Sequence, residues 1–163
     1  QTVVAVLEGA VLGGGFGLAC VSDIAISRDN AQFGLPETGL GVLPAQIAPF
    51  VVKRIGLTQA RRLALLGSRF NGETAQKLGV VHDVVHDENE LEQLLSDTVQ
   101  QIKRAAPLAS RNTKALLHRT LNEPLDSLLD DAAQQFAQAV GGVEGQEGTM
   151  AFIQKRLPTW TEQ

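Results

Sequence analysis

Three consecutive glycines, Gly13 to Gly15, join an apolar stretch to the run Phe16 to Val21, which is expected to be a buried helix. Glycine tolerates unusual dihedral angles and lets another group approach the backbone closely. The first turn of a helix also leaves N–H groups unpaired and carries a partial positive charge. The N–H of Gly14 could therefore stabilise a carbonyl oxygen that gains negative charge. A plain strand-to-helix turn explains the glycines equally well. A phosphate loop is excluded, because no Gly-Lys-Ser/Thr follows and no G-x-G-x-x-G pattern is present.

A carboxylate follows the end of an expected strand in the segment AQFGLPETGLG, residues 31 to 41. Glu37 comes directly after Pro36, and most of its neighbours are apolar residues or glycines. A carboxylate in that setting is expected to be partly removed from water, which suits general acid–base catalysis. The residues alone leave two other interpretations open, an exposed loop glutamate and a partner for a helix N-cap.

Composition and charge exclude several classes of partner. The 163 residues are 44% hydrophobic and 20% charged, with a net charge of −4. No basic run is present and no apolar run approaches ~18 residues, so we expect neither nucleic acid nor a membrane as a partner. Cys20 is the single cysteine, which fits a cytoplasmic location. No His/Cys/Asp cluster has the spacing of metal ligands, so no metal is expected.

Short elements are expected to position the glycines and Glu37. Gly56 and Gly67 should each end a helix, and Asn71 should cap one. The expected strands are Thr2–Leu7, buried on both faces, and 23–27, 31–34 and 80–85. The expected helices are 47–55, 58–66 and 73–78, and 39–44 is expected to be loop.

The second half of the chain is expected to be helical, with breaks at Pro107 and Pro124. Asp87 and Glu90 form a start that resembles a capping box. Apolar residues at helical spacing predict a core or subunit-contact stripe: Leu125, Leu128, Leu129, Ala132, Ala133 and Phe136. A last short helix is expected at 150–156. We therefore predict two parts, 1–86 around the glycines and Glu37, and a helical part, 87–163.

Taken together, five segments are similar to the signatures of the crotonase (enoyl-CoA hydratase/isomerase) superfamily. The segments are GAVLGGGFGLACVSD (9–23), AQFGLPETGLGVLP (31–44), IGLTQARRLALLG (55–67), AQKLGVV (75–81) and MAFIQKR (150–156). The resemblance covers nearly the whole chain. It implies an α/β fold, a spiral of ββα turns whose N-terminal portion would precede Gln1, followed by a helical trimerisation region. It also implies a homotrimer or a dimer of trimers, and no cofactor other than the coenzyme A of the acyl-CoA substrate.

The same resemblance implies roles for particular residues. Gly14 would supply one oxyanion N–H, and the second donor would come from an earlier strand-loop. Phe152 and Lys155, predicted on one helix face at i, i+3, would contact the adenine and phosphate of CoA, although a core Phe and a solvated Lys remain an alternative. The residues expected to contact the substrate are Gly13, Gly17, Pro36, Leu43 and Pro44.

Two departures from the family pattern reduce the number of reactions and substrates that are expected. The best-known hydratases carry a glutamate at the position of Gly17 as well as at Glu37, so we expect a gap at Gly17, filled by water or by a carboxylate of the substrate. The run Pro44–Phe50, PAQIAPF, replaces the usual Pro-Gly-x-Gly-Gly-Thr-Gln and resembles hydratases that act on glutaconyl-CoA derivatives.

The resemblance, together with these departures, predicts an enzyme. It would be a hydro-lyase that hydrates isohexenyl- or methylglutaconyl-CoA in acyclic-terpene or leucine breakdown. One alternative is a 3,2-enoyl-CoA isomerase with Glu37 as its sole proton shuttle. The other is a non-catalytic relative that binds acyl-CoA.

Overall fold

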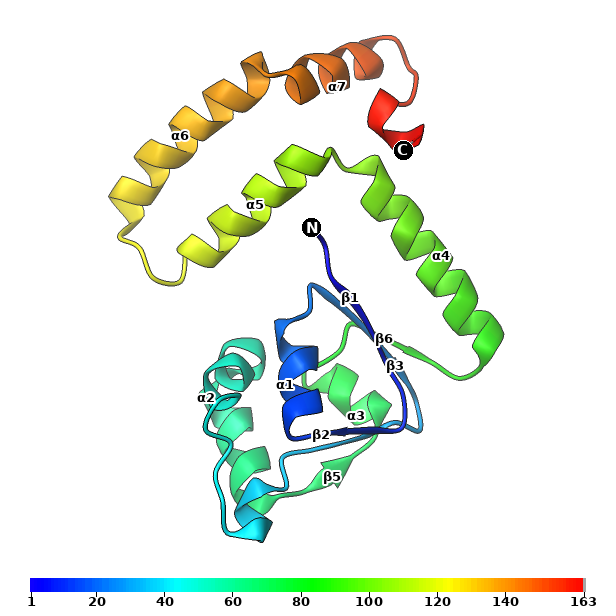
Figure 1. Ribbon diagram of the computed structural model, residues 1–163, viewed down its shortest axis with the longest axis vertical. Coiled ribbons are helices and arrows are strands. Elements are labelled where there is room, and N and C mark those ends of the chain that lie inside the picture. The colour runs from blue at the N-terminus through cyan, green and yellow to red at the C-terminus, as the bar shows by residue number, and fades with distance from the viewer. Residues whose placement is uncertain (163) are drawn as a thin grey trace. The chain divides into compact units, whose positions relative to one another are not determined.

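Two three-stranded sheets carry the first part of the chain in the computed structural model, which describes residues 1–162 (Figure 1). One sheet contains, in spatial order, β1 (Val4–Leu7), β3 (Ile24–Arg28) and β6 (Asp83–Val85), all parallel. The other contains β2 (Ala10–Leu12), β4 (Gln32–Gly34) and β5 (Arg69–Phe70), with β2 and β4 parallel and β5 antiparallel to β4. The chain divides into two compact units, residues 3–94 and residues 95 onward together with 1–2.

The strand pairing builds successive ββα turns. β1 and β2 lead into α1 (Gly14–Val21), and β3 and β4 then return beside them, with Val4 opposite Ile24 and Ala10 opposite Gln32. Parallel neighbours require a crossover connection, which α1 provides here. The predicted α/β architecture with ββα turns is thus confirmed.

Glycines and one asparagine divide the helices of this unit as their local chemistry predicts. α2 (Ala48–Leu66) is interrupted at Gly56, whose φ of 74° is left-handed, so its two halves correspond to the two predicted helices. Gly67 ends α2 with φ 60° and donates its N–H to Leu63 O at 3.0 Å. Asn71 caps α3 (Gly72–Lys77) by accepting the N–H of Thr74 at 3.1 Å.

Three expectations for this unit are wrong. β1 is half-buried, not fully buried, and Val6 is 38% exposed. β2 was not expected as a strand, since three residues between two glycines carry no periodicity. Residues 39–44, expected as loop, begin inside η1, a 3₁₀ helix at Glu37–Leu40.

Three phenylalanines join α1, β4 and β5. Phe16 of α1 and Phe33 of β4 are fully buried, and their rings meet edge to face with centroids 6.3 Å apart. Phe70 of β5 completes the cluster, stacked on Phe33 at 5.8 Å and edge-on to Phe16 at 6.1 Å. Aromatic pairs contribute about 0.5–1.5 kcal/mol each beyond the area they bury. The cluster therefore fixes α1 against the end of β4.

The C-terminal unit is helical. Its elements are most of α4 (Glu88–Arg104), then α5 (Pro107–Arg119), α6 (Leu125–Gly141), α7 (Val143–Ile153) and the 3₁₀ helix η2 (Thr159–Glu162). The predicted cap of α4 is present, because Asp87 accepts the N–H of Glu90 at 2.9 Å. α7 begins seven residues before the predicted start at Met150, and it ends at Ile153. No helix among residues 1–162 is both long and apolar enough to cross a membrane.

An ion pair ties the end of this unit together. The carboxylate of Glu147 accepts hydrogen bonds from both terminal nitrogens of Arg156, at 2.7 and 2.9 Å. It also accepts one from the backbone N–H of Thr159 at 2.9 Å. The guanidinium of Arg156, with the Thr159 N–H, lowers the pKa of Glu147 to about 2. Most of the predicted stripe on α6 is not core within its own unit: Leu128 is buried and Ala132 is half-buried, whereas four of the six residues are exposed, namely Leu125, Leu129, Ala133 and Phe136.

Candidate functional site

The start of α1 and the residue Glu37 lie at one edge of the second sheet. β2 and β4 are parallel, with Leu12 opposite Gly34, so both strands end at the same edge. Gly13, the residue after β2, donates its N–H to Gly34 O at 3.2 Å. The chain leaves one strand into α1 and the other into Leu35, Pro36 and Glu37. Two segments distant in the sequence are therefore neighbours for a topological reason.

The N-terminus of α1 is uncapped and open. Gly13 holds φ 50° and ψ −116°, which favours glycine, and as the N-cap residue it has no side chain to offer. The first bond within the turn runs from the Gly17 N–H to Gly13 O at 3.1 Å, so the N–H groups of residues 14 to 16 have no acceptor four residues earlier. A Cβ added at Gly14 or Gly15 would meet no other described atom within 4 Å. A ligand thus has room to reach these N–H groups.

The carboxylate of Glu37 lies beside this helix terminus. Its Oε1 is 3.2 Å from the point that a Cβ on Gly13 would occupy. Its Oε2 is fully buried and has no hydrogen-bond partner among residues 1–162. Buried polar atoms are nearly always paired, so an unpaired carboxylate oxygen calls for an explanation such as a ligand.

The backbone around Glu37 is held on both sides. Glu37 O accepts the N–H of Val42 at 3.0 Å. The hydroxyl of Thr38 donates to Ala64 O in α2 at 2.8 Å. Leu35, two residues earlier, is buried in the core. The carboxylate is consequently supported by the strand end, by η1 and by α2, and a helix N-terminus beside it can hold an oxygen that develops negative charge.

Gly17 corrects the expectation of a gap. The residue is buried in α1, and a Cβ there would lie 2.4 Å from Ile47 Cγ2 and 2.9 Å from Ile47 Cβ. The space beside Gly17 is already filled by a side chain of this protein. The position directly next to Gly17 is therefore not a gap.

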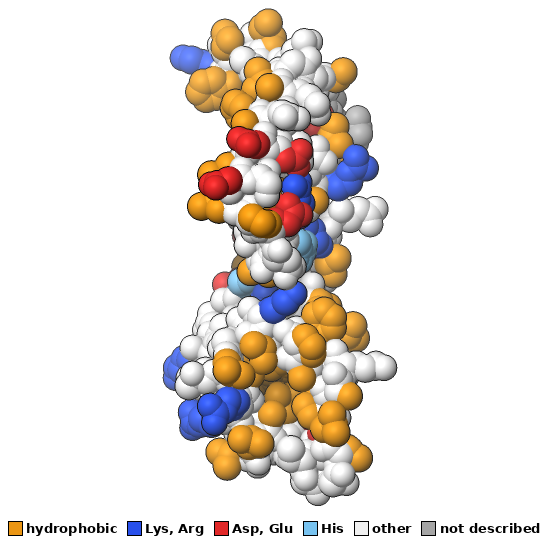
Figure 2. Space-filling model, turned by 90° about the vertical axis from the view of Figure 1, so that its left-hand side faces the viewer, with side chains coloured by type: hydrophobic (Ala, Val, Ile, Leu, Met, Phe, Trp, Pro, Cys, Tyr) orange, Lys and Arg blue, Asp and Glu red, His pale blue; other side chains and the backbone are white. Residues whose placement is uncertain are grey.

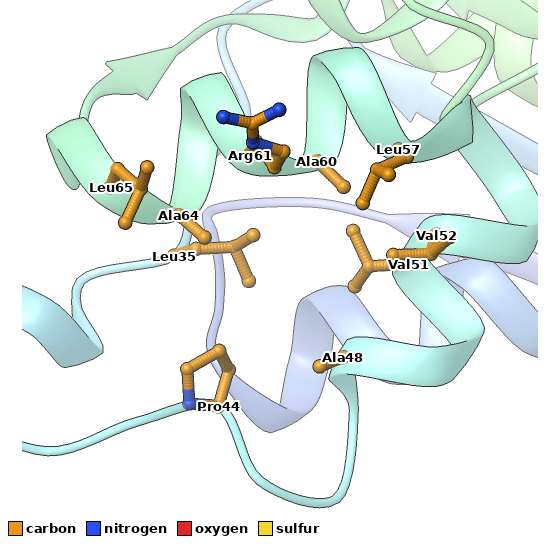
Figure 3. A pocket seen from close by; sticks show the side chains of 10 residues that line it. All are labelled: Leu35, Pro44, Ala48, Val51, Val52, Leu57, Ala60, Arg61, Ala64 and Leu65. Carbon is orange, nitrogen blue, oxygen red and sulfur yellow. The ribbon is translucent and has the colours of Figure 1, made fainter.

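A cavity of about 340 Å³ lies along α2 within the same unit, with Leu35, two residues before Glu37, in its wall (Figure 3). It is lined by Leu35, Pro44, Ala48, Val51, Val52, Leu57, Ala60, Arg61, Ala64 and Leu65. Figure 3 shows the guanidinium of Arg61 pointing away from the space that the apolar side chains face. Hydrophobic side chains also gather on the α2 side of this unit, where Leu57, Leu65 and Leu66 are exposed (Figure 2). The cavity suits a hydrocarbon group.

Of the other predicted substrate contacts, two lie at the cavity or next to Glu37, and one does not. Pro44 lines the cavity, and Pro36 is the residue before η1, directly next to Glu37. Leu43 is 72% exposed and is not part of the cavity wall. The cavity residues on α2 and Ile47 were not singled out from the sequence, because an apolar helix face looks the same whether it packs against the core or lines a cavity.

The predicted CoA contacts, Phe152 and Lys155, lie in the C-terminal unit. Phe152 is 85% exposed at the end of α7. Lys155 follows the helix and adopts φ 53°, the one left-handed residue other than glycine in the part of the chain described. The expectation that both share one helix face is therefore wrong, because the helix ends before Lys155 and the chain reverses there. The Arg156 N–H then bonds to Ala151 O at 3.0 Å.

The surroundings of Cys20 and His82 indicate structural roles for both residues. Burial raises the pKa of the Cys20 thiol to about 11, although Arg54 opposes this, so the reactive thiolate is disfavoured. His82 Nδ1 accepts the N–H of Ala25 at 2.9 Å, and burial lowers the pKa of His82. Arg54 donates to Val80 O at 3.0 and 3.1 Å. His82 therefore joins its own segment to β3, and Arg54 joins α2 to the segment before β6.

Comparisons with known proteins agree with this geometry. The family model described as "Enoyl-CoA hydratase/isomerase" matches residues 1–163. The solved structure of Pseudomonas aeruginosa AtuE is 64% identical with a TM-score of 0.98, over 99% of this chain and 62% of that one. An enoyl-CoA hydratase/isomerase from Marinobacter aquaeolei is 60% identical with a TM-score of 0.96, over 99% of this chain and 61% of that one.

Curated relatives are more distant. Enoyl-CoA hydratase ACTT6 of Alternaria alternata is 35% identical, over 93% of this chain and 51% of its own length. The 2,3-dehydroadipyl-CoA hydratase of Escherichia coli (strain K12) is 32% identical, over 97% of this chain and 62% of its own length. The chain thus spans between about half and three fifths of these relatives.

Proposed function

This chain belongs to the enoyl-CoA hydratase/isomerase family, and we propose that the protein containing it is a hydro-lyase that adds water to an enoyl-CoA thioester. One observation carries the proposal. The carboxylate of Glu37, with one buried and unpaired oxygen, lies beside the open and uncapped N-terminus of α1. Hydration needs these two elements, a site for a negative oxygen and a group that moves protons.

The helix terminus supplies the first element. When a nucleophile adds to Cβ, negative charge moves through Cα to the thioester oxygen. The N–H of Gly14, the first residue of α1, donates to that oxygen, and the positive end of the helix adds to the effect. By the family resemblance, a second donor belongs to a strand-loop before residue 1. Glycine at 14 and 15 keeps the approach free of side chains.

Glu37 supplies the second element with a single carboxylate. It removes a proton from water while the water oxygen bonds to Cβ, which gives the enolate and a protonated Glu37. The same carboxyl then delivers a proton to Cα and returns to its ionised form. The sum is one water added across the double bond, with no net change in the protein.

Product analysis tests the reaction. We expect the full-length protein to convert an enoyl-CoA into a 3-hydroxyacyl-CoA, whose mass is greater by one water. An isomerase, for which a lone proton-shuttling carboxylate is also sufficient, would leave the mass unchanged and move the double bond. A panel of 2-enoyl- and 3-enoyl-CoA thioesters followed by mass spectrometry separates the two. Binding without any turnover would support a non-catalytic acyl-CoA-binding protein.

We propose isohexenyl- or methylglutaconyl-CoA as the substrate. The run Pro44–Phe50 resembles the hydratases of this type, and the cavity along α2, which Leu35 also lines, is apolar, as a hydrocarbon branch requires. The name of the Escherichia coli relative denotes a CoA thioester of another dicarboxylic acid. Because Ile47 fills the space directly next to Gly17, we propose that the distal carboxylate of the substrate binds away from that position.

We further propose that the protein is a homotrimer or a dimer of trimers. The support is the set of large apolar side chains that α6 and α7 leave exposed within their own unit, from 48% to 86%. They are Leu125, Leu129, Phe136, Val140, Val143, Met150, Phe152 and Ile153. Apolar patches of this kind commonly mark protein contacts.

Lys155 is proposed to bind a phosphate of CoA, together with Phe152 near the adenine. A lysine in the left-handed region costs about 1–2 kcal/mol relative to glycine, so a functional reason for it is expected. We expect Lys155→Gly to unfold at a higher temperature and yet to bind CoA several-fold more weakly. Thermal melting and calorimetric titration with CoA measure the two effects.

Lys155→Arg serves as the matched control, because it keeps both the charge and the backbone strain. It should bind CoA nearly as the parent does. Unchanged CoA affinity in Lys155→Gly would remove Lys155 from the CoA site.

A further inference from the structure

The contact between Gly17 and Ile47 leaves no room for any side chain at position 17. The Cβ of a side chain at position 17 would lie 2.4 Å from Ile47 Cγ2 and 2.9 Å from Ile47 Cβ. Real Cβ atoms essentially never come closer than 3.0 Å to such an atom. A change of the Ile47 rotamer moves Cγ2 but leaves Cβ in place. The two residues therefore form a size-matched pair.

Ile47 cannot easily move away. It is the residue before α2, with φ −92° and ψ −22°. Its carbonyl accepts the N–H groups of Phe50 and Val51, each at 3.0 Å. Its side chain is half-buried against the main core cluster, to which the fully buried Val51 belongs. The beginning of α2 thus holds Ile47 against α1.

Ile47 and the carboxylate of Glu37 both lie against the beginning of α1. Glu37 Oε1 approaches Gly13 and Ile47 approaches Gly17, and the Gly17 N–H bonds to Gly13 O at 3.1 Å. The two side chains therefore contact α1 one turn apart. The neighbours of Ile47 in the sequence, Pro44 and Ala48, line the apolar cavity. A substrate carbon that reacts with Glu37 would meet an aliphatic wall on this side.

We propose that Ile47 determines the selectivity of the site. By taking the space of a side chain at Gly17, it replaces a polar neighbour of Glu37 with a hydrocarbon surface. This surface favours enoyl-CoA thioesters that carry a hydrocarbon branch at the reacting carbon over unbranched ones. The inference rests on the proposed acyl-CoA function and adds the class of acyl group and the residue that selects it.

A cycle of variants in the full-length protein tests the packing without any assay of activity. Gly17→Ala should lower the melting temperature by roughly 5 °C or more, because the new Cβ overpacks against Ile47. In the Ile47→Gly background the same change should raise it, because the methyl group fills space and alanine favours a helix. Ile47→Gly is used because an alanine at 47 would keep the Cβ at 2.9 Å.

Gly15→Ala is the matched control for the cycle. It makes the same change in the same helix, where the Cβ meets no described atom within 4 Å. Its effect on melting should be equal in both backgrounds. If Gly17→Ala also shifted melting equally in both backgrounds, the size-matched pair would be refuted.

Selectivity is measured on matched thioesters. For the parent protein we expect kcat/KM for 3-methylcrotonyl-CoA to exceed that for crotonyl-CoA. Ile47→Gly should reduce this ratio about 10-fold or more, since a lost apolar contact is commonly worth 10- to 200-fold. Ile47→Val should keep most of the ratio, and Leu66→Ala, an exposed residue of α2, should leave it unchanged.

Binding measurements distinguish an error about the role of Ile47 from an error about the proposed hydratase activity. Calorimetric titration with 3-methylbutyryl-CoA and butyryl-CoA gives the same ratio without turnover. If no thioester is hydrated but the ratio of binding constants falls in Ile47→Gly, the hydratase proposal fails and the role of Ile47 stands. An unchanged ratio in Ile47→Gly, in turnover or in binding, overturns the inference.

Discussion

Replacing Glu37 by glutamine lowers kcat by about 10²–10⁴-fold, the contribution expected of a group that transfers protons in the transition state. Glutamine keeps the size of the side chain and one oxygen, but it can neither take a proton from water nor deliver one to carbon. Steady-state kinetics on the full-length protein with its best enoyl-CoA measures the loss. KM should change little, because the substrate retains its contacts.

The same variant should be more stable than the parent. Glu37 Oε2 is buried and unpaired among the described residues, and burying an unpaired charged oxygen costs more than burying an amide. We expect Glu37→Gln to raise the free energy of unfolding by on the order of 1 kcal/mol. An activity loss together with a stability gain is the signature of a strained functional group, whereas a structural glutamate would lose stability when replaced.

Glu73→Gln provides the matched control for this pair of measurements. Glu73 lies in the same compact unit, at the exposed start of α3. Its replacement should leave kcat unchanged and alter stability only slightly. Near-normal turnover of Glu37→Gln would remove Glu37 from the mechanism and assign the proton transfers to another group.

Local signals predicted much of the unit that carries the site. Gly56, Gly67 and Asn71 each act on a few neighbouring residues through their own dihedral angles or side-chain oxygen, and each is where the sequence places it. The placement of Glu37 beside the glycines was not available from spacing. It follows from the parallel pairing of β2 with β4, which brings Gly13 and Gly34 within one hydrogen bond.

The wrong expectation at Gly17 has a physical origin. A glycine in the sequence shows that a side chain is missing, but not what takes its place. At Gly14 and Gly15 the space is open, and at Gly17 it is filled by Ile47, although all three lie in one short segment. The expectation of a helical Lys155 fails for another reason, because a lysine gives no local sign of a left-handed turn.

The space beside Gly14 is open, unlike that beside Gly17, so the oxyanion donor can be tested by substitution at Gly14. We expect Gly14→Pro to lower kcat by about 10²–10³-fold, the usual cost of removing one such donor. Proline removes the N–H without breaking the helix, because the first helical position needs no intrahelical acceptor and suits the φ of proline. KM should be nearly unchanged, since the donor acts mainly on the charge of the transition state.

Two variants separate the lost donor from a disturbed helix. Gly15→Pro also removes one first-turn N–H from α1, and it should cost much less activity if Gly14 is the donor. Gly14→Ala adds a Cβ in open space while keeping the N–H, and it should retain more activity than Gly14→Pro. Equal losses in the two proline variants, with equal melting temperatures, would assign the effect to the helix terminus as a whole. Full activity of Gly14→Pro would mean that the negative oxygen binds elsewhere, and the open glycines would then serve only the turn from β2 into α1.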